Sequence, residues 1–342
     1  MKIPYIPQDG KDKISAFGSA LVDLCILERD EFLKSCGASK GGMVLTDHLF
    51  IKSLLEKASS APTIIPGGSA CNTILGIGKL GGNACFIGKR GADKLGDLFE
   101  QGLREHNVES VLLNSEIPTG HVLSIITPDA QRSMFTFLGA SADTKPEEIS
   151  ESYFKDTALV HFEGYLVSNR PLLLKALECA KSSGALISLD LASYTVVEQS
   201  KAFLDEIIDN YVDILIANED EAAAFSGLSV EEEAFEYLAS RAEIAVMKLG
   251  KRGSIIGHDG ETIIIAPQGE GDAIDTTGAG DLWAAGFLYG LINGMSLREC
   301  GALGSECGFE VCQNIGAVIP PQGWERIKIR LQVEEKGMPA LS

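Results

Sequence analysis

Short apolar runs alternate with amphipathic stretches along most of the chain, and each kind of segment predicts a different element. Runs rich in Val, Ile, Leu and Phe are typical of strands buried on both faces, and apolar positions three and four residues apart indicate helices. The predicted strands cover residues 14–19, 84–88, 159–162, 186–190, 214–217 and 244–249. The predicted helices cover residues 172–183, 202–211, 230–241 and 281–294. This alternation predicts an α/β fold with a mostly parallel sheet that is covered on both faces.

Two regions depart from this rhythm and predict further strands outside the main sheet. Residues 122–127 and 132–138 alternate polar and apolar side chains around Pro128-Asp129, which predicts a β-hairpin. Residues 21–27 have a similar strand-like pattern. The stretch 30–60 comes after residues 21–27, and we expect it to be an insertion with two short helices.

Composition narrows the class of protein. The chain has 342 residues, of which 45% are hydrophobic, and this is enough for a large core in one or two domains. The formal net charge of -19 repels nucleic acid and anionic lipid, so neither nucleic acid nor a membrane is an expected partner. The first 13 residues lack the apolar core of a secretory signal, and no C-x-x-C pair occurs among the eight cysteines. We therefore expect a cytoplasmic protein with reduced, buried thiols.

A glycine-rich turn before the last predicted helix carries the most informative chemistry. Residues 275–281 read Asp-Thr-Thr-Gly-Ala-Gly-Asp, so Gly278, Ala279 and Gly280 open the helix with backbone N–H groups that suit an anion. Asp281 follows directly, and a carboxylate beside an anion site makes sense as the acceptor of a proton from a hydroxyl that attacks phosphorus. The alternative is that Asp281 only stabilises the helix N-terminus.

A second glycine pattern does not carry the function that it first suggests. Residues 76–81 match G-x-G-x-x-G, but this dinucleotide-binding motif works only between a strand and the helix that it opens. Here the pattern falls at the end of a predicted helix, so we expect these glycines to end and pack that helix. No G-x-x-x-x-G-K-[ST] loop occurs, which argues against a Walker-type ATPase.

Two stretches in the expected order resemble the signatures of the ribokinase-type (PfkB) family of carbohydrate and nucleoside kinases. One is Pro-Gly-Gly-Ser-Ala-Cys-Asn-Thr at 66–73, with Leu-Gly-Gly at 80–82, and the other is the turn at 275–281. The resemblance implies a ribokinase-like three-layer α/β/α sandwich with a mostly parallel central sheet and a small β-sheet lid. It also implies one kinase domain over 1–342, with a discontinuous lid at about 20–66 and 112–140.

The resemblance implies an ATP-dependent kinase and gives roles to residues at its nucleotide end. Asp281 would be the catalytic base, beside an anion hole at Gly278, Ala279 and Gly280. Residues 218–221 match the family's N-x-x-E motif, which implies that Asn218 and Glu221 organise Mg²⁺ and phosphate through water. The alternative is an acidic helix N-terminus.

In the turn 248–253, Gly250 and Gly253 would leave room for the nucleotide. Lys248 is either a phosphate contact or a solvated charge at a strand end.

The resemblance also implies a substrate end and a monovalent-cation site. Asp23 matches the family's sugar-binding aspartate, which would accept two hydrogen bonds from a diol; the alternative is an ordinary turn residue. The second sugar-contact element corresponds to Gly67, Gly68 and Asn72. Arg132 on the predicted hairpin either closes over the phosphates or is a surface charge.

A K⁺ site built from backbone carbonyls would involve the segments that contain Asp275, Thr277, Val311, Asn314 and Gly316.

The inserted stretch favours one substrate over others. Residues 41–47 and 131–141 resemble the adenosine-kinase-like branch, and Phe32, Leu33, Met43, Leu45 and Phe50 could roof a pocket for a purine. They could equally pack the insertion onto the body. We therefore predict phosphorylation of a nucleoside, adenosine first, at its 5′-hydroxyl. The alternatives are a sugar kinase for ribose, fructose or 2-keto-3-deoxygluconate, and a non-catalytic binding protein.

Free edges of the lid sheet predict a homodimer through the lid.

Overall fold

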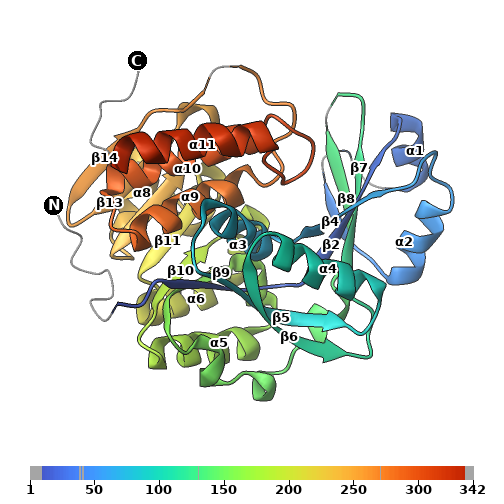
Figure 1. The fold of residues 1–342 in the computed structure, drawn as a ribbon, viewed down its shortest axis with the longest axis horizontal. Coiled ribbons are helices and arrows are strands. Elements are labelled where there is room, and N and C mark those ends of the chain that lie inside the picture. Colours follow the sequence, from blue (N-terminus) through green and yellow to red (C-terminus); the bar gives the residue numbers. More distant parts are fainter. Residues whose placement is uncertain (1–9, 38–39, 41, 130, 270, 336–342) are drawn as a thin grey trace.

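The computed structural model describes residues 10–37, 40, 42–129, 131–269 and 271–335, and a nine-stranded sheet runs through this part of the chain (Figure 1). In spatial order its strands are β14 (Glu261–Ile265), β13 (Ser254–His258), β12 (Ile244–Lys248), β11 (Ile214–Asn218), β10 (Leu186–Asp190), β9 (Thr157–Glu163), β1 (Lys13–Phe17), β5 (Ala84–Gly91) and β6 (Val108–Ser115). The strands from β12 to β6 are parallel, and β13 and β14 add an antiparallel edge.

Alternating side chains of this sheet enter two separate cores, because successive residues of a strand point to opposite faces. Ile214 and Ile216 of β11 belong to one core, and Leu215 and Ala217 belong to the other. The first core contains side chains of α3 (Ser69–Leu80), α4 (Lys94–Glu105), α9 (Ala279–Ile292), α10 (Leu297–Val311) and α11 (Pro321–Glu335). The second contains side chains of α5 (Arg170–Ser182), α6 (Tyr194–Tyr211), α7 (Glu219–Ser226) and α8 (Glu231–Ala239). The predicted three-layer α/β/α arrangement is confirmed.

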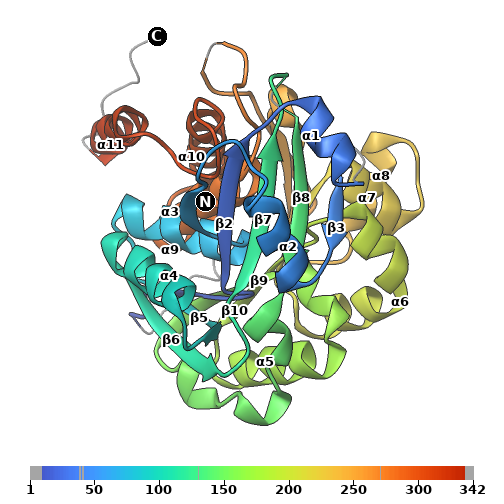
Figure 2. The same cartoon turned by 90° about the vertical axis from the view of Figure 1, so that its right-hand side faces the viewer.

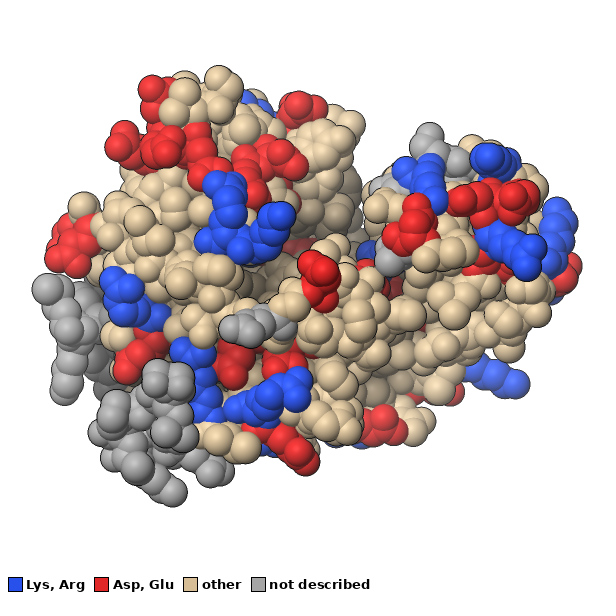
Figure 3. All heavy atoms as spheres, turned by 90° about the horizontal axis from the view of Figure 1, so that it is seen from above, with Lys and Arg blue, Asp and Glu red and all other residues tan. Residues whose placement is uncertain are grey.

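A second sheet of five strands, which we call the small sheet, stands beside the body at the right of Figure 1 and faces the viewer in Figure 2. In spatial order it consists of β3 (Met43–Leu45), β8 (Arg132–Phe137), β7 (Gly120–Ile126), β2 (Leu21–Leu27) and β4 (Thr63–Gly67). One of its faces packs against α1 (Asp30–Ser35) and α2 (His48–Leu55). Leu33 of α1 belongs to one core cluster with Leu24 of β2, and the rings of Phe50 in α2 and Phe135 in β8 are in contact. Seen from above, the molecule is hollowed between the body and the small sheet (Figure 3).

Strand pairing sets which side chains share the other face of the small sheet. Asp23 lies opposite Ile65 and Val122, Val122 lies opposite Thr136, and Thr136 lies opposite Leu45. Paired residues point to the same side of a sheet. The row through Asp23, together with the next row through Cys25, Ser124, Met134 and Met43, therefore forms one surface, which we call the Asp23 face.

The structure confirms the predicted elements and adds others. All six predicted strands, the hairpin and the two short helices of the insertion are present. The helix predicted at 202–211 begins earlier, at Tyr194, because buried Val197 packs in the core although this turn has low helix propensity. Five strands were not predicted, namely β3, β4, β6, β13 and β14. The remaining short 3-10 segments are η1 (Gly139–Asp143), η2 (Pro146–Glu148), η3 (Glu151–Phe154), η4 (Gly164–Ser168) and η5 (Gly250–Arg252).

Two further observations concern the cysteine thiols and the apolar character of the helices. All eight cysteines, each within the described residues, have free thiols, as the absence of any C-x-x-C pair suggested. Five of them are buried, whereas Cys25, Cys36 and Cys312 are half-buried, so the expectation of buried thiols is met only in part. Among the described helices, none combines the length and apolar character that crossing a membrane requires.

Candidate active site

Charged and polar side chains gather where neighbouring parallel strands of the large sheet end. The last residues of β9, β10, β11 and β12 are Glu163, Asp190, Asn218 and Lys248. Because these strands are parallel neighbours, their carboxyl ends lie along one edge, which is where ligands bind in open α/β sheets.

Asp281 lies between the N-terminal turns of two helices. It is in the first turn of α9, and its carboxylate accepts hydrogen bonds from two residues of α3, at 2.7 Å from Ser69 Oγ and 2.9 Å from Asn72 Nδ2. Thr73 Oγ1 donates to the carbonyl oxygen of Asp281 at 3.1 Å. Burial raises the pKa of Asp281, and the hydrogen bonds from Asn72 and Ser69 oppose that rise. The carboxylate is thus oriented, partly exposed and more basic than an ordinary aspartate.

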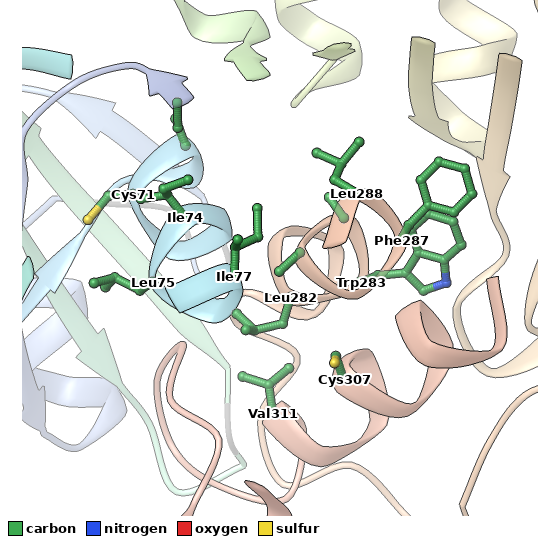
Figure 4. Close-up of a cluster of buried hydrophobic side chains, with 14 of the residues drawn as sticks. Cys71, Ile74, Leu75, Ile77, Leu282, Trp283, Phe287, Leu288, Cys307 and Val311 are labelled. Carbon is green, nitrogen blue, oxygen red and sulfur yellow. The ribbon is translucent and has the colours of Figure 1, made fainter. Parts of the chain in front are cut away.

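Apolar packing holds the two helices in this relation. Figure 4 shows Ile74 and Ile77 of α3 beside Leu282 of α9, with Val311 of α10 below them. A Cβ at Gly76 would lie 2.7 Å from both Ala285 Cβ and Leu282 Cδ1, so the glycine allows α3 and α9 to approach closely. The helix α3 ends at Gly81, whose left-handed φ is 94°. The glycines at 76–81 therefore pack and end a helix, as predicted.

The turn before α9 has the features of an anion site. Gly278 is the N-cap residue with a left-handed φ of 73°, and no side chain caps this helix end. A Cβ at Gly278 would lie 2.5 Å from Ala317 Cβ, so glycine is required there for two reasons. The first-turn N–H groups of a helix have no intrahelical partner, and here they lie beside Asp281. The N–H of Ala279 donates to the carbonyl oxygen of Thr276 at 3.1 Å, which corrects the expectation that it belongs to the anion hole.

Lys248 lies inside the site, and the expectation of a solvated strand-end charge is wrong. Its side chain is 14% exposed, and its ammonium lies 2.6 Å from Asp190 Oδ2. Burial opposes the charge, but the carboxylates of Asp190 and Glu221 hold the pKa of Lys248 above its ordinary value. The ammonium would lie 3.0 Å from a Cβ at Gly280, which places it at the first turn of α9.

Asn218 and Glu221 close a reciprocal pair at the start of α7. Glu221 Oε2 accepts from the Asn218 backbone N–H at 2.8 Å, and Asn218 Oδ1 accepts from the Glu221 N–H at 2.9 Å. Asn218 Nδ2 also donates to Glu221 Oε1 at 2.8 Å. Burial, and then the nearby carboxylate of Asp190, raise the pKa of Glu221. The pair is therefore a helix cap and also part of the charged group around Lys248.

Asp23 meets the glycines of the predicted second sugar-contact element. A Cβ at Gly67 would lie 2.6 Å from Asp23 Oδ2, and Gly68, with φ of 95°, allows the carbonyl oxygen of Ser19 to come close. Burial raises the pKa of Asp23 to about 6; the positive charge of Arg132 lowers it and the charge of Asp281 raises it. Arg132 shares the Asp23 face and donates from Nη2 to Met134 Sδ at 3.0 Å.

Only part of the predicted pocket roof lies on the Asp23 face. Met43 and Leu45 lie on it and are largely exposed. Leu33 is buried in the core, and Phe50 packs against Phe135 on the opposite face. Phe32 likewise packs against that core. For Phe32, Leu33 and Phe50 the roof prediction is wrong, because α1 and α2 use these side chains to cover the back of the small sheet.

The segments of the predicted monovalent-cation site are neighbours. Asp275 Oδ1 accepts from the backbone N–H of Thr277 at 3.0 Å and from its hydroxyl at 2.7 Å, and Oδ2 accepts from the Gly316 N–H at 2.8 Å. Asn314 donates its backbone N–H to the carbonyl oxygen of Val311 at 3.3 Å within the second segment. Asp275 thus ties the turn before α9 to the chain after α10.

The two glycines of the turn after β12 differ in their surroundings. A Cβ at Gly250 would meet no atom within 4 Å, so this position is open, as a contact with a nucleotide requires. A Cβ at Gly253 would lie 2.0 Å from the carbonyl oxygen of Ile265. The glycine at 253 therefore accommodates the neighbouring strand β14, and this corrects the expectation that it leaves room for a ligand.

Three residues of the site were not predicted from the sequence. Ser69 and Asp190 contact Asp281 and Lys248 respectively. Glu163 is 2% exposed and accepts backbone N–H groups of Ser19 at 2.9 Å and Ala70 at 3.0 Å, so it joins the exit of β1 to the start of α3. An acidic residue at the carboxyl end of a predicted parallel strand is the signal that could have found Glu163 and Asp190.

Comparison with known proteins agrees with this geometry. The model of the pfkB family carbohydrate kinase matches residues 44–323. The structure of a probable sugar kinase from Rhizobium etli superposes with a TM-score of 0.86 at 31% identity, covering 94% of this chain and 98% of that one. Adenosine kinase from Sinorhizobium meliloti gives a TM-score of 0.86 at 30% identity, covering 94% of this chain and 100% of the other. A probable fructokinase-4 from Arabidopsis thaliana is 27% identical over 281 residues, which are 76% of this chain and 86% of that protein.

By name, two of these relatives are probable sugar kinases and the third is an adenosine kinase. The family match covers most of the chain, including the turn at 275–281 and the strands that carry the charged edge. The chain therefore belongs to the PfkB family of carbohydrate kinases and is a phosphotransferase that acts on a hydroxyl group of a sugar or nucleoside.

Proposed function

We propose that the protein transfers the γ-phosphoryl group of ATP to the 5′-hydroxyl of a nucleoside, with adenosine as the first candidate. The observation that carries the proposal is the placement of Asp281. Its carboxylate is oriented by Ser69 and Asn72, is made more basic by burial, and adjoins a helix N-terminus without a side-chain cap. A non-catalytic binding protein would have no use for a base at this position.

The proposed reaction moves one proton and one phosphoryl group. The substrate hydroxyl gives its proton to Asp281 while its oxygen forms a bond to the γ-phosphorus, and the bond from that phosphorus to the β–γ bridging oxygen breaks. ADP leaves with the electron pair of that bond. The N–H groups of Gly278, Gly280 and Asp281 stabilise the charge on the transferred group.

The Asp23 face supports a nucleoside as the substrate. Asp23 would hold the ribose diol near Gly67 and Gly68, and the small sheet would act as a lid over it. Next to Asp23 the face is mostly apolar: it is lined by Ile65, Val122, Met134, Met43 and Leu45, with Thr136 and Ser124 between them. An apolar wall of this kind favours the faces of a purine, whereas a free sugar needs more hydrogen-bonding groups.

A comparison of specificity constants tests the substrate. We expect kcat/KM with ATP to be highest for adenosine among the nucleosides. Ribose, fructose and 2-keto-3-deoxygluconate should be assayed in parallel, because relatives include sugar kinases. A free sugar with a specificity constant above that of every nucleoside would overturn the nucleoside proposal. It would leave the phosphoryl-transfer chemistry intact.

Magnesium is the divalent ion that we propose for the reaction. Among the described residues, no group of three or more His, Cys, Asp and Glu side chains could hold a metal ion by itself. The single carboxylate of Glu221, paired with the amide of Asn218, fits Mg²⁺ bound through water, because this ion retains waters and takes phosphate oxygens. When bound, Mg²⁺ would neutralise charge on the β- and γ-phosphates.

Replacing Glu221 by Gln tests this role. The amide keeps the size of the side chain and can still accept from the Asn218 N–H, but it loses the negative charge. We expect the Mg²⁺ concentration for half-maximal rate to rise by about 10-fold to 100-fold, as for loss of an outer ligand contact. The check is a titration of rate against Mg²⁺ at saturating ATP, with Glu219→Gln as the matched control on the same helix turn. If both variants titrate like the parent protein, Glu221 is only a helix cap.

Two further features of the family resemblance remain proposals for this chain. The carbonyl groups around Asp275 and Gly316 are proposed to bind K⁺, since Asp275 holds these two segments together. A homodimer through the lid is proposed because β3 is an exposed strand at one edge of the small sheet.

A further inference from the structure

Lys248 is a buried cation among carboxylates, at a place where the proposed reaction needs positive charge. The charges of Asp190, Glu221 and Asp281 all act on its ammonium. Among the carboxylates of the described residues, that of Asp190 alone is in direct contact with it, at 2.6 Å. A buried ion pair of this kind is weak support for stability, because desolvation of both charges offsets their attraction. Its position therefore calls for a reason other than holding the fold together.

Asp190 is the fixed member of the pair. Its second carboxylate oxygen, Oδ1, accepts from the backbone N–H of Ala192 at 3.0 Å, and Ala192 has a left-handed φ of 64°. The same turn runs against Gly164, where a Cβ would lie 2.4 Å from the carbonyl oxygen of Leu191. One carboxylate oxygen is thus held by the backbone, and the other is presented to Lys248. We therefore infer that Asp190 fixes the position of the long lysine side chain, and not the reverse.

The ammonium of Lys248 borders the anion site. It lies 3.0 Å from the position that a Cβ would take at Gly280, one of the residues whose N–H groups open α9. A side chain at 280 would therefore push against the ammonium as well as against a bound phosphoryl group. The ammonium of Lys248 and the N–H groups at the N-terminus of α9 therefore both contribute positive charge to the anion site.

We propose that Lys248 contacts the oxygens of the transferring phosphoryl group and that Asp190 is the positioning residue that aims it. This rests on the proposed phosphoryl transfer. Lys248 forms and breaks no covalent bond: the substrate proton still goes to Asp281, and ADP still takes the electron pair. The ammonium balances negative charge that increases on the phosphoryl oxygens, and Asp190 keeps it charged and in place before ATP binds.

Three variants test the proposal by their rates. Lys248→Met keeps the length of the side chain without its charge, and we expect kcat to fall by about 10-fold to 100-fold. Asp190→Asn keeps the acceptor for the Ala192 N–H, and we expect a fall of about 5-fold to 20-fold. Because Asp190 acts through Lys248, the double variant should be no slower than Lys248→Met. In all three, KM for the phosphate acceptor should change by less than about threefold.

A second buried lysine provides the matched control. Lys89 of β5 is 4% exposed and pairs with Asp143 and Glu148, so Lys89→Met removes another buried, paired cation outside the site. We expect it to lower the melting temperature while leaving kcat within about twofold of the parent. Circular dichroism and thermal melts of every variant separate loss of rate from loss of folding.

The outcomes separate this inference from the function on which it rests. If the parent protein phosphorylates no nucleoside or sugar, the proposed function fails. If the parent is active and folded Lys248→Met keeps its kcat, the role of Lys248 is refuted. If the two single effects multiply in the double variant, Asp190 acts independently and its positioning role is refuted. Equal rates of the double variant and Lys248→Met, with the single-variant losses described, support both roles.

Discussion

Asp281→Asn should lower turnover by about 10²–10⁴-fold with much smaller changes in KM for either substrate. The amide can keep both neighbours, with its oxygen accepting from Asn72 Nδ2 and its N–H donating to Ser69 Oγ. The orientation of the side chain is then preserved, and only the ability to accept a proton is lost. Steady-state rates of parent and variant, measured on proteins with matching thermal melts, check this result.

The pH dependence of the parent rate gives an independent check of the same residue. Since burial raises the pKa of Asp281, the rate should fall on acidification at a higher pH than for an exposed aspartate. Hydrogen bonds from Ser69 and Asn72 stabilise the ionised form, so Ser69→Ala should raise this pKa further and move the acid limb to higher pH. An Asp281→Asn protein with near-parental turnover, or an acid limb unmoved in Ser69→Ala, would argue for another base.

Gly280→Val should reduce turnover by about 10²–10³-fold, as loss of anion-hole stabilisation does in other enzymes. Its Cβ would lie 3.0 Å from the ammonium of Lys248, and the branched methyl groups would extend into the space that the phosphoryl oxygens need. The backbone of α9 need not change, since Gly280 does not have the left-handed backbone of Gly278. The rate at saturating ATP, measured on folded protein, is the quantity to compare.

Gly280→Ala is the graded control for this prediction. A single Cβ meets only the flexible end of Lys248, which can shift, so we expect a loss intermediate between the parent and Gly280→Val. A folded Gly280→Val protein with parental kinase activity would show that the turn serves the fold alone.

Much of the fold could be predicted because its strands are buried on both faces and read as apolar runs. Two missed strands had a signal of their own: Asp259 and Gly260, with φ of 50° and 75°, form the turn between β13 and β14, and Asp-Gly is a strong hairpin sequence. For β3 no such signal exists. It has three residues and pairs with β8, which is distant in the chain. Only the folded structure brings these two segments together.

The candidate site could be predicted where a motif names a residue, as at Asp281, Asn218 and Asp23. What the sequence did not contain is the set of contacts between distant motifs. Asn72 was expected to contact the sugar, but its amide is 2.9 Å from Asp281, because the packing of α3 against α9 decides where it points. Asp190 was read only as the end of a strand, since its partner Lys248 is 58 residues further along the chain.

The pairing of β2 with β7 has a consequence for how the protein folds. The two strands are parallel neighbours, with Leu21 opposite Gly120, although the whole of β5, α4 and β6 lies between them in the chain. Closing so long a loop costs conformational entropy before any contact is gained, and such non-local pairing is slow. Until β7 arrives, one edge of β2 has no strand to pair with. The apolar side chains of β2, among them Leu24 and Ile26, then lack the neighbouring side chains of β7. We therefore expect the small sheet to assemble after the body, with its first strand exposed to aggregation while the chain is still being synthesised.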